Sequence, residues 1–208
     1  NVVVAEGVIQ QITMVAPSRT KTTVAGNGTS GFSGDGGFAT AASLFNPLGV
    51  AADAEGNIFI ADTSNSRIRR VGPNRVISTV ADSGLSSIGD GELATAARLN
   101  FPTGVAVDGS GNVLIGDTFN RRVRRVGADG KIGTVAGYGE HGYSGDGGPA
   151  SSATFRYLTG VAADSSGNLF IIDACNDTVR KVGSDGVINT LGGTGTWFFC
   201  EFETYFVP

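Results

Sequence analysis

The chain has 208 residues, of which 33 are glycine and 6 proline, 40% are apolar and 16% are charged. This composition is too apolar for a disordered chain and too rich in glycine for a helical bundle, so it predicts a turn-rich β protein. Nineteen acidic and 15 basic residues give a net charge of −4, which argues against a dedicated surface for nucleic acid or anionic membranes. Because no stretch approaches the roughly 18 apolar residues of a membrane helix, we predict no membrane span.

The chain is built from a repeat of 55 to 56 residues. The run Gly-Val-Ala-Ala-Asp at 49–53 returns as Gly-Val-Ala-Val-Asp at 104–108 and as Gly-Val-Ala-Ala-Asp at 160–164. Asn1 and Ala5 lie in phase with Asn57 and Ala61, so the chain starts part-way through a unit. The sequence predicts a partial unit at 1–26, three full units up to residue 193, and a divergent aromatic tail at 194–208.

Each unit predicts four short strands separated by turns. In the middle copy the strands are expected at 104–107, 112–116, 121–126 and 131–136, and the turns between them are rich in Asp, Asn and Gly, the residues that favour tight turns. A long crossing of roughly 20 residues follows each unit. It carries Gly-Phe-Ser-Gly-Asp-Gly-Gly at 31–37, the same pattern with Tyr at 142–148, and a degraded copy around 89–91.

Tandem four-stranded antiparallel units predict an all-β fold, the β-propeller, in which each unit is one blade. The pattern of Gly-Val-Ala-x-Asp, Gly-Asn, a strand ending in Asp, Asn-x-Arg-x-Arg and a closing Thr-Val-Ala resembles the NHL-repeat family in its glycine-rich bacterial and teneurin-like form. The resemblance covers residues 1–193 and implies about four blades here, whereas such propellers usually close with about six. We expect a piece of a longer propeller. The alternative is a four-bladed ring in which the tail supplies the missing first strand.

Six aspartates recur in the turns and are expected to act structurally. They cap backbone amides and pair with a local Asn or Arg, because a residue present in every copy does the same work in every blade; the six are Asp53, Asp108, Asp164, Asp62, Asp117 and Asp173. The competing hypothesis is a carboxylate array for calcium. The loop aspartates Asp35, Asp90 and Asp146 are candidate binding residues, since glycine-rich backbone beside a carboxylate suits hard cations, but one Asp per loop is a small ligand set.

The third strands are rich in arginine, which raises the alternative of a nucleic-acid stripe. No aromatic residue interleaves them as a stacking platform, so we predict an ordinary solvated strand face and no nucleic-acid partner; the residues are Arg67, Arg69, Arg70, Arg121, Arg122, Arg124, Arg125, Arg180 and Lys181. Enzymes resembling this family include amidating lyases, whose zinc sites need several histidines. His141 is the one histidine of the chain, so an active site would need blades outside this sequence.

Two features favour an extracellular or cell-surface setting. Cys175 and Cys200 both lie where the repeat breaks, which predicts a disulfide between the tail and the last blade, the alternative being two unrelated thiols. Asn27 and Asn176 begin Asn-x-Thr sequons and are candidate glycosylation sites. The sequence thus predicts a non-catalytic interaction or structural module that binds a protein or glycan, with no cofactor. The alternatives are a propeller lyase or hydrolase, and a subunit that self-associates through open blade edges.

Overall fold

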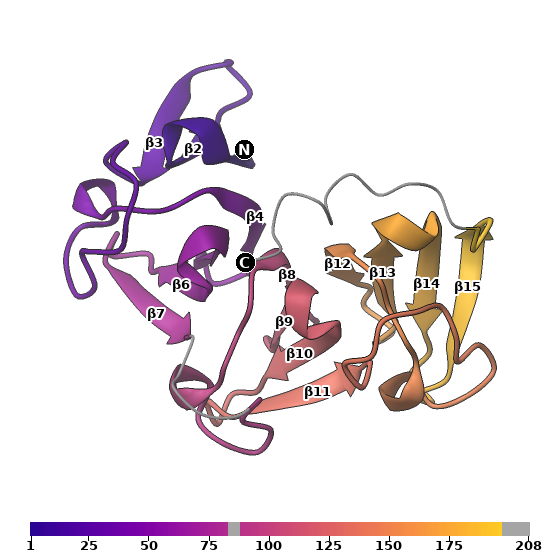
Figure 1. The fold of residues 1–208 in the computed structure, drawn as a ribbon. Coiled ribbons are helices and arrows are strands. Elements are labelled where there is room, and N and C mark those ends of the chain that lie inside the picture. The colour runs from indigo at the N-terminus through magenta and orange to yellow at the C-terminus, as the bar shows by residue number, and fades with distance from the viewer. Residues whose placement is uncertain (83–87, 197–208) are drawn as a thin grey trace.

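The computed structural model describes residues 1–82 and 88–196. Within them the chain forms one three-stranded and three four-stranded antiparallel sheets, so the predicted all-β fold of four-stranded blades is confirmed. Figure 1 shows the sheets following one another around an arc in chain order, from indigo to yellow. The first sheet consists of β1 (Val2–Glu6), β2 (Gln11–Val15) and β3 (Lys21–Ala25). β1 corresponds to the second strand of the later sheets, so the described residues of this sheet supply three strands.

The three complete sheets repeat one pattern, in which consecutive strands pair as neighbours. The second sheet contains β4 (Pro47–Ala52), β5 (Ile58–Asp62), β6 (Arg67–Val71) and β7 (Ile77–Ala81). The third contains β8 (Pro102–Val107), β9 (Val113–Asp117), β10 (Arg122–Val126) and β11 (Ile132–Ala136). The fourth contains β12 (Leu158–Ala163), β13 (Leu169–Asp173), β14 (Thr178–Val182) and β15 (Ile188–Gly193).

Short 3₁₀ turns complete each unit. They lie in the crossing before a blade and between its second and third strands: η1 (Gly7–Ile9), η2 (Ala39–Ala41), η3 (Thr63–Asn65), η4 (Ala94–Ala96), η5 (Thr118–Asn120), η6 (Ala150–Ser152) and η7 (Ala174–Asn176). The first alanine of each crossing turn is buried, so the turn places an apolar side chain between two blades. In the described parts of the chain no helix is long and apolar enough to cross a membrane.

The core lies between neighbouring sheets. Alternate apolar residues of each strand point to the preceding sheet and the others to the following sheet, as the period of a strand requires. Three buried clusters result, one at each junction between consecutive sheets. The inner strands β4 and β8 approach so closely that a Cβ on Gly49 would lie 2.4 Å from the Thr103 carbonyl oxygen. Glycine at this position therefore sets how tightly the blades converge.

Candidate interaction site at the first turn of the blades

The turn between the first and second strands of each complete blade is held by an aspartate and an asparagine four residues later. In the second sheet the Asn57 amide and side-chain Nδ2 donate to Asp53 at 2.7 and 2.6 Å. Asn112 donates to Asp108 at 2.9 and 2.8 Å, and the same pairing joins Asn168 to Asp164 at 2.9 and 2.7 Å. These bonds hold each carboxylate in one orientation relative to its strand.

The hydrogen bonds favour the ionised form of two of these carboxylates. Partial burial acts to raise the pKa of Asp108, but hydrogen bonds from Asn112 and Ser110 outweigh it, so the pKa lies below its usual range. The Asn168 side chain and amide likewise lower the pKa of the half-buried Asp164. Arg125 and Lys181, one strand further out, add to the effect on Asp108 and Asp164 respectively. The centre of this face is thus negative and its rim is basic.

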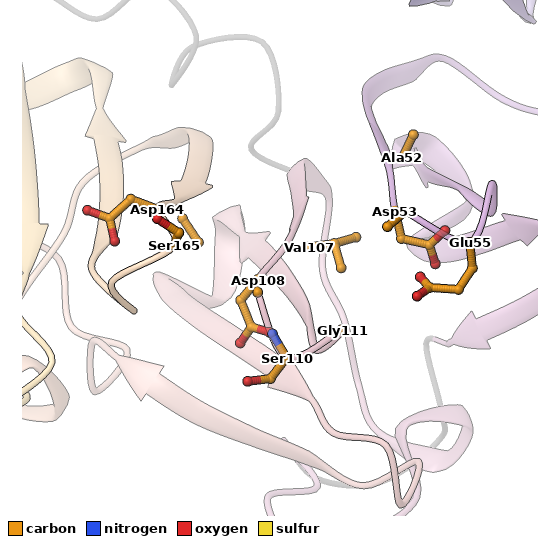
Figure 2. Close-up of a pocket in the computed structure, with 12 residues that line it drawn as sticks. Ala52, Asp53, Glu55, Val107, Asp108, Ser110, Gly111, Asp164 and Ser165 are labelled. Carbon is orange, nitrogen blue, oxygen red and sulfur yellow. The ribbon is translucent and has the colours of Figure 1, made fainter.

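The three turns surround a hollow of about 560 Å³. Figure 2 shows Asp53 and Glu55 on one side, Asp108 and Ser110 between them and the fourth sheet, and Asp164 and Ser165 on the far side. Small side chains such as Ala52 and Gly111 form the rest of the wall, so access is wide. Four carboxylates around an open hollow favour a partner that brings cationic or hydrogen-bond-donating groups.

No group of three or more His, Cys, Asp or Glu side chains within residues 1–82 and 88–196 is placed to hold a metal ion. The calcium hypothesis therefore has no ligand set in this part of the chain. The six turn aspartates are brought together only in part. Asp53, Asp108 and Asp164 line the hollow, whereas Asp62, Asp117 and Asp173 lie at the other end of the second strand and are fully buried.

The buried aspartates organise the crossing into each blade. In the second sheet Asp62 accepts hydrogen bonds from the Phe45 amide at 2.7 Å and from Asn65 Nδ2 at 2.8 Å. Asp117 accepts from the Asn100 amide and Asn120, both at 2.8 Å. Asp173 accepts from the Tyr157 amide at 3.1 Å and from Asn176 Nδ2 at 2.7 Å. One carboxylate therefore fixes both the start of the blade and its second turn.

The prediction of a solvated arginine face is wrong for one arginine in each complete blade. Arg69, Arg124 and Arg180 have no exposed surface. Arg69 donates to Asp35 at 2.6 Å, to the Ser33 carbonyl at 3.0 Å and to Asp62 at 3.4 Å. Burying a cation is costly unless it is paired and hydrogen-bonded, and these partners supply that pairing.

The other two blades repeat this network with small differences. Arg124 donates to Asp90 at 2.7 Å and to Asp117 at 3.3 Å. Arg180 donates to Asp146 at 2.5 Å and to the Thr154 carbonyl at 3.2 Å. The loop aspartates Asp35, Asp90 and Asp146 thus each hold an arginine of the following blade. Their role in binding an external ligand stays a prediction.

Burial raises the pKa of these carboxylates, whereas their hydrogen bonds and ion pairs lower it. Desolvation raises the pKa of Asp117 to about 6, even though Asn120, Asn100 and Arg124 all favour the charged form. Burial also raises the pKa of Asp62 and Asp173. At the loop end, burial acts to raise the pKa of Asp146, but the bonds from Arg180 and Thr190 outweigh it and hold the pKa below its usual range.

A spacing in the sequence signals this network. The arginine follows the buried aspartate by seven residues and the loop aspartate by 34 residues in all three complete units. The arginines that directly follow Arg69 and Arg124 in the sequence differ from them in burial, since Arg70 and Arg125 are exposed. A buried ion pair is indicated when an arginine recurs at a fixed sequence spacing from two aspartates and lies on the buried face of its strand.

The structure separates the two sequons. Asn27 is exposed, and its Oδ1 accepts the Thr29 amide at 2.8 Å. Asn176 is 4% exposed, and its Nδ2 donates to Gly142 O and Asp173, so a glycan on Asn176 has no room in the folded chain. Asn176 occupies the position of Asn65 and Asn120, whose role is structural. Cys175 is buried; Cys200 lies outside the described residues, and their disulfide stays a prediction.

Comparison with known proteins agrees with the repeat pattern. Residues 9–88 match the family model described as the Teneurin NHL domain. Mouse Teneurin-1 is 31% identical over 187 residues, which covers 82% of this chain and 7% of the teneurin. The chain therefore spans less than a tenth of the length of the teneurins that it matches.

Two solved structures share the fold at low identity. A streptogramin B lyase superposes with a TM-score of 0.59 at 10% identity, over 90% of this chain and 49% of the lyase. A chain of a nidogen/laminin complex superposes with a TM-score of 0.59 at 13% identity, over 95% of this chain and 66% of that chain. The 31% identity to mouse Teneurin-1 over 82% of the chain, together with the match over residues 9–88, identifies the chain as an NHL-repeat propeller region distantly homologous to that of teneurins.

Proposed function

We propose that this chain is a non-catalytic interaction module of an extracellular or cell-surface protein, and that it binds a protein partner through the face that surrounds the acidic hollow. The observation that carries the proposal is the fixed orientation of three carboxylates, each held by its own asparagine around an open hollow of about 560 Å³. Fixed charges on short turns recognise a partner with little loss of conformational entropy.

The distant homology to teneurins supports the extracellular setting. A nidogen chain with the same fold was solved in a complex with laminin, which illustrates this architecture in a protein complex. The lyase neighbours share only the fold with this chain. Since Asp53, Asp108 and Asp164 already accept bonds from their own blades, they serve better as fixed charges than as groups that exchange protons with a substrate.

Glu55 provides a test of the hollow. It lines the hollow and is exposed, and Glu140 is an equally charged, exposed residue elsewhere. The purified chain, tetramerised on streptavidin, is screened against a panel of secreted ectodomains and a glycan array. We expect saturable binding to an ectodomain, lost in Glu55→Lys and kept in Glu140→Lys, which changes the net charge equally.

Four outcomes would contradict this proposal. Equal loss of binding in both variants would indicate a general charge effect. Undisturbed binding in both would place the partner on another face. Binding to glycans alone would replace the protein partner with a glycan. Turnover of a lyase or hydrolase substrate by the purified chain would replace the binding function with catalysis.

A further inference from the structure

A crevice of about 280 Å³ opens between the third and fourth sheets, beside the acidic hollow. This volume is close to the lower limit of the range of about 300 to 1,000 Å³ that is usual for small-molecule sites. Both walls are apolar, with Leu114 and Val135 from the third sheet and Leu169 and Val182 from the fourth. Because all four strands of each sheet are described, the crevice is built by two complete blades.

One row of residues across the third sheet carries smaller side chains than the same row of the other complete sheets. Leu114 pairs with Arg125 on the next strand, and Arg125 pairs with Gly133 on the last strand. The second and fourth sheets have phenylalanine at the first position and a polar side chain at the third: Phe59, Arg70, Ser78 and Phe170, Lys181, Asn189. A Cβ on Gly133 would meet nothing within 4 Å. Arg125 therefore lies between two places where the third sheet lacks bulk.

The junction between the second and third sheets shows what fills this space elsewhere in the chain. Phe59 packs into that junction and is 5% exposed. On the opposing wall, Ala163 at the crevice replaces Val107 of that junction, whereas Leu169 replaces Val113 and is one methylene larger. The phenylalanine ring is the largest group that the crevice lacks. Since open apolar cavities take up small aromatic molecules, a benzyl group from outside the chain fits this space.

Two opposite charges line the same crevice. Arg125 is exposed, and within residues 1–82 and 88–196 its guanidinium has no hydrogen-bonding partner. Asp108 Oδ1 accepts the Ser110 and Asn112 amides, and Oδ2 accepts Asn112 Nδ2, so Oδ2 keeps a lone pair for a further donor. A ligand with one anionic and one cationic group complements both side chains.

We propose that the crevice binds a free aromatic α-amino acid of the phenylalanine type, with its ring against Leu114, its carboxylate on Arg125 and its ammonium group on Asp108. Burial of the ring between the two apolar walls drives binding, and the charge-assisted hydrogen bonds fix the orientation of the ligand. This inference goes beyond the proposed protein partner of the acidic hollow. Glu55, which lines the hollow, does not line the crevice.

Titration of the ¹⁵N-labelled full chain with L-phenylalanine up to about 20 mM, followed by amide chemical shifts, tests the proposal. We expect saturable shifts around Leu114 and Leu169. Two analogues, 3-phenylpropanoate without the ammonium group and 2-phenylethylamine without the carboxylate, should each bind at least about tenfold more weakly.

Three variants place the ligand in the crevice. Leu114→Phe supplies the ring from the chain itself and should abolish binding. Leu191→Phe adds the same ring to an exposed leucine outside the crevice and should bind phenylalanine like wild type. Arg125→Gln removes the partner of the carboxylate and should weaken binding at least about tenfold.

The absence of saturable shifts in the wild-type chain would overturn the proposal, as would unchanged affinity in Leu114→Phe or Arg125→Gln. An analogue that binds as tightly as phenylalanine would overturn the assignment to an amino acid. Circular dichroism checks that each variant is folded, and Arg125→Gln decides alone if Leu114→Phe unfolds. Glu55→Gln should keep the affinity for phenylalanine, so this site and the partner of the hollow are tested separately; loss of affinity in Glu55→Gln would move the ligand out of the crevice.

Discussion

Asp35 and Arg69 lie 34 residues apart in the sequence and are joined by a hydrogen bond of 2.6 Å. Asp35 also accepts from the Thr79 hydroxyl at 2.6 Å. The glycine-rich loop is thereby fastened to the third and fourth strands of the blade that follows it. The same link joins Asp146 to Arg180 in the last blade.

Replacing Arg69 by methionine should destabilise the chain strongly. Without the guanidinium, Asp62 keeps a buried charge that has lost its cation, and breaking such a pair costs about 3 to 5 kcal/mol of the free energy of unfolding. Urea unfolding followed by circular dichroism measures the loss. Arg70→Met, on the adjacent and exposed residue, should change the value by less than about 0.5 kcal/mol. Equal effects of the two substitutions would contradict the buried network.

The pKa of Asp117 should be higher in the folded protein than in the unfolded chain. Its pKa is raised by burial to about 6, above the value of 3.8 in an unfolded chain. The folded state therefore binds this proton more tightly than the unfolded chain does. Protonation of Asp117 adds its full contribution to the free energy of unfolding below the unfolded pKa of 3.8, and this contribution is lost as pH rises through about 6. NMR of the side-chain carboxyl carbon (Cγ) of Asp117 as a function of pH measures the titration midpoint. Asp108, whose pKa is lowered, is the internal comparison. A midpoint for Asp117 below that of Asp108 would contradict the effect of burial.

A side chain at Gly49 should separate two blades. Its Cβ would lie 2.4 Å from the Thr103 carbonyl oxygen and 3.2 Å from the Val105 amide nitrogen, and backbone has little freedom to move away. We expect Gly49→Val to lower the free energy of unfolding by about 1 to 3 kcal/mol, measured by thermal unfolding. Gly109→Val, at a position where a Cβ meets nothing within 4 Å, is the matched control, and a loss in the control as large as in Gly49→Val would refute the packing argument.

The two sequons should behave differently when the chain is secreted from a eukaryotic host. We expect a glycan on exposed Asn27 and none on buried Asn176. Intact mass before and after enzymatic removal of N-linked glycans counts the sites, with Asn27→Gln as the control that removes the shift. Asn176→Ala should instead lower stability, since it removes the Nδ2 bond to Asp173. A glycan found on Asn176 would contradict the packing around it.

The architecture was accessible from the sequence because its signals are local and occur in every copy. The Asp-Gly-rich turns and alternating strands predict each blade, and β8 to β11 lie within two residues of the expected ranges. The structure was needed to see that one hollow brings together Asp53, Asp108 and Asp164. Strand patterns in a sequence do not show how neighbouring blades converge. The burial of Arg69 was missed because strand alternation says which face a residue takes, and that face is normally apolar in a core.

Within the described residues, the groups that bind each buried arginine come from its own unit. Asp35, Asp62 and Ser33 lie on the same stretch as Arg69, and Asp146, Ser144 and Thr154 lie on the same stretch as Arg180. A gene duplication that copies residues 26–81 would therefore deliver the buried Arg69 together with the two carboxylates that hold it. Only the apolar surfaces between units must then match, and those tolerate exchange among aliphatic side chains. Because each buried arginine is paired within its own unit, the number of blades is free to change during evolution without leaving that arginine unpaired.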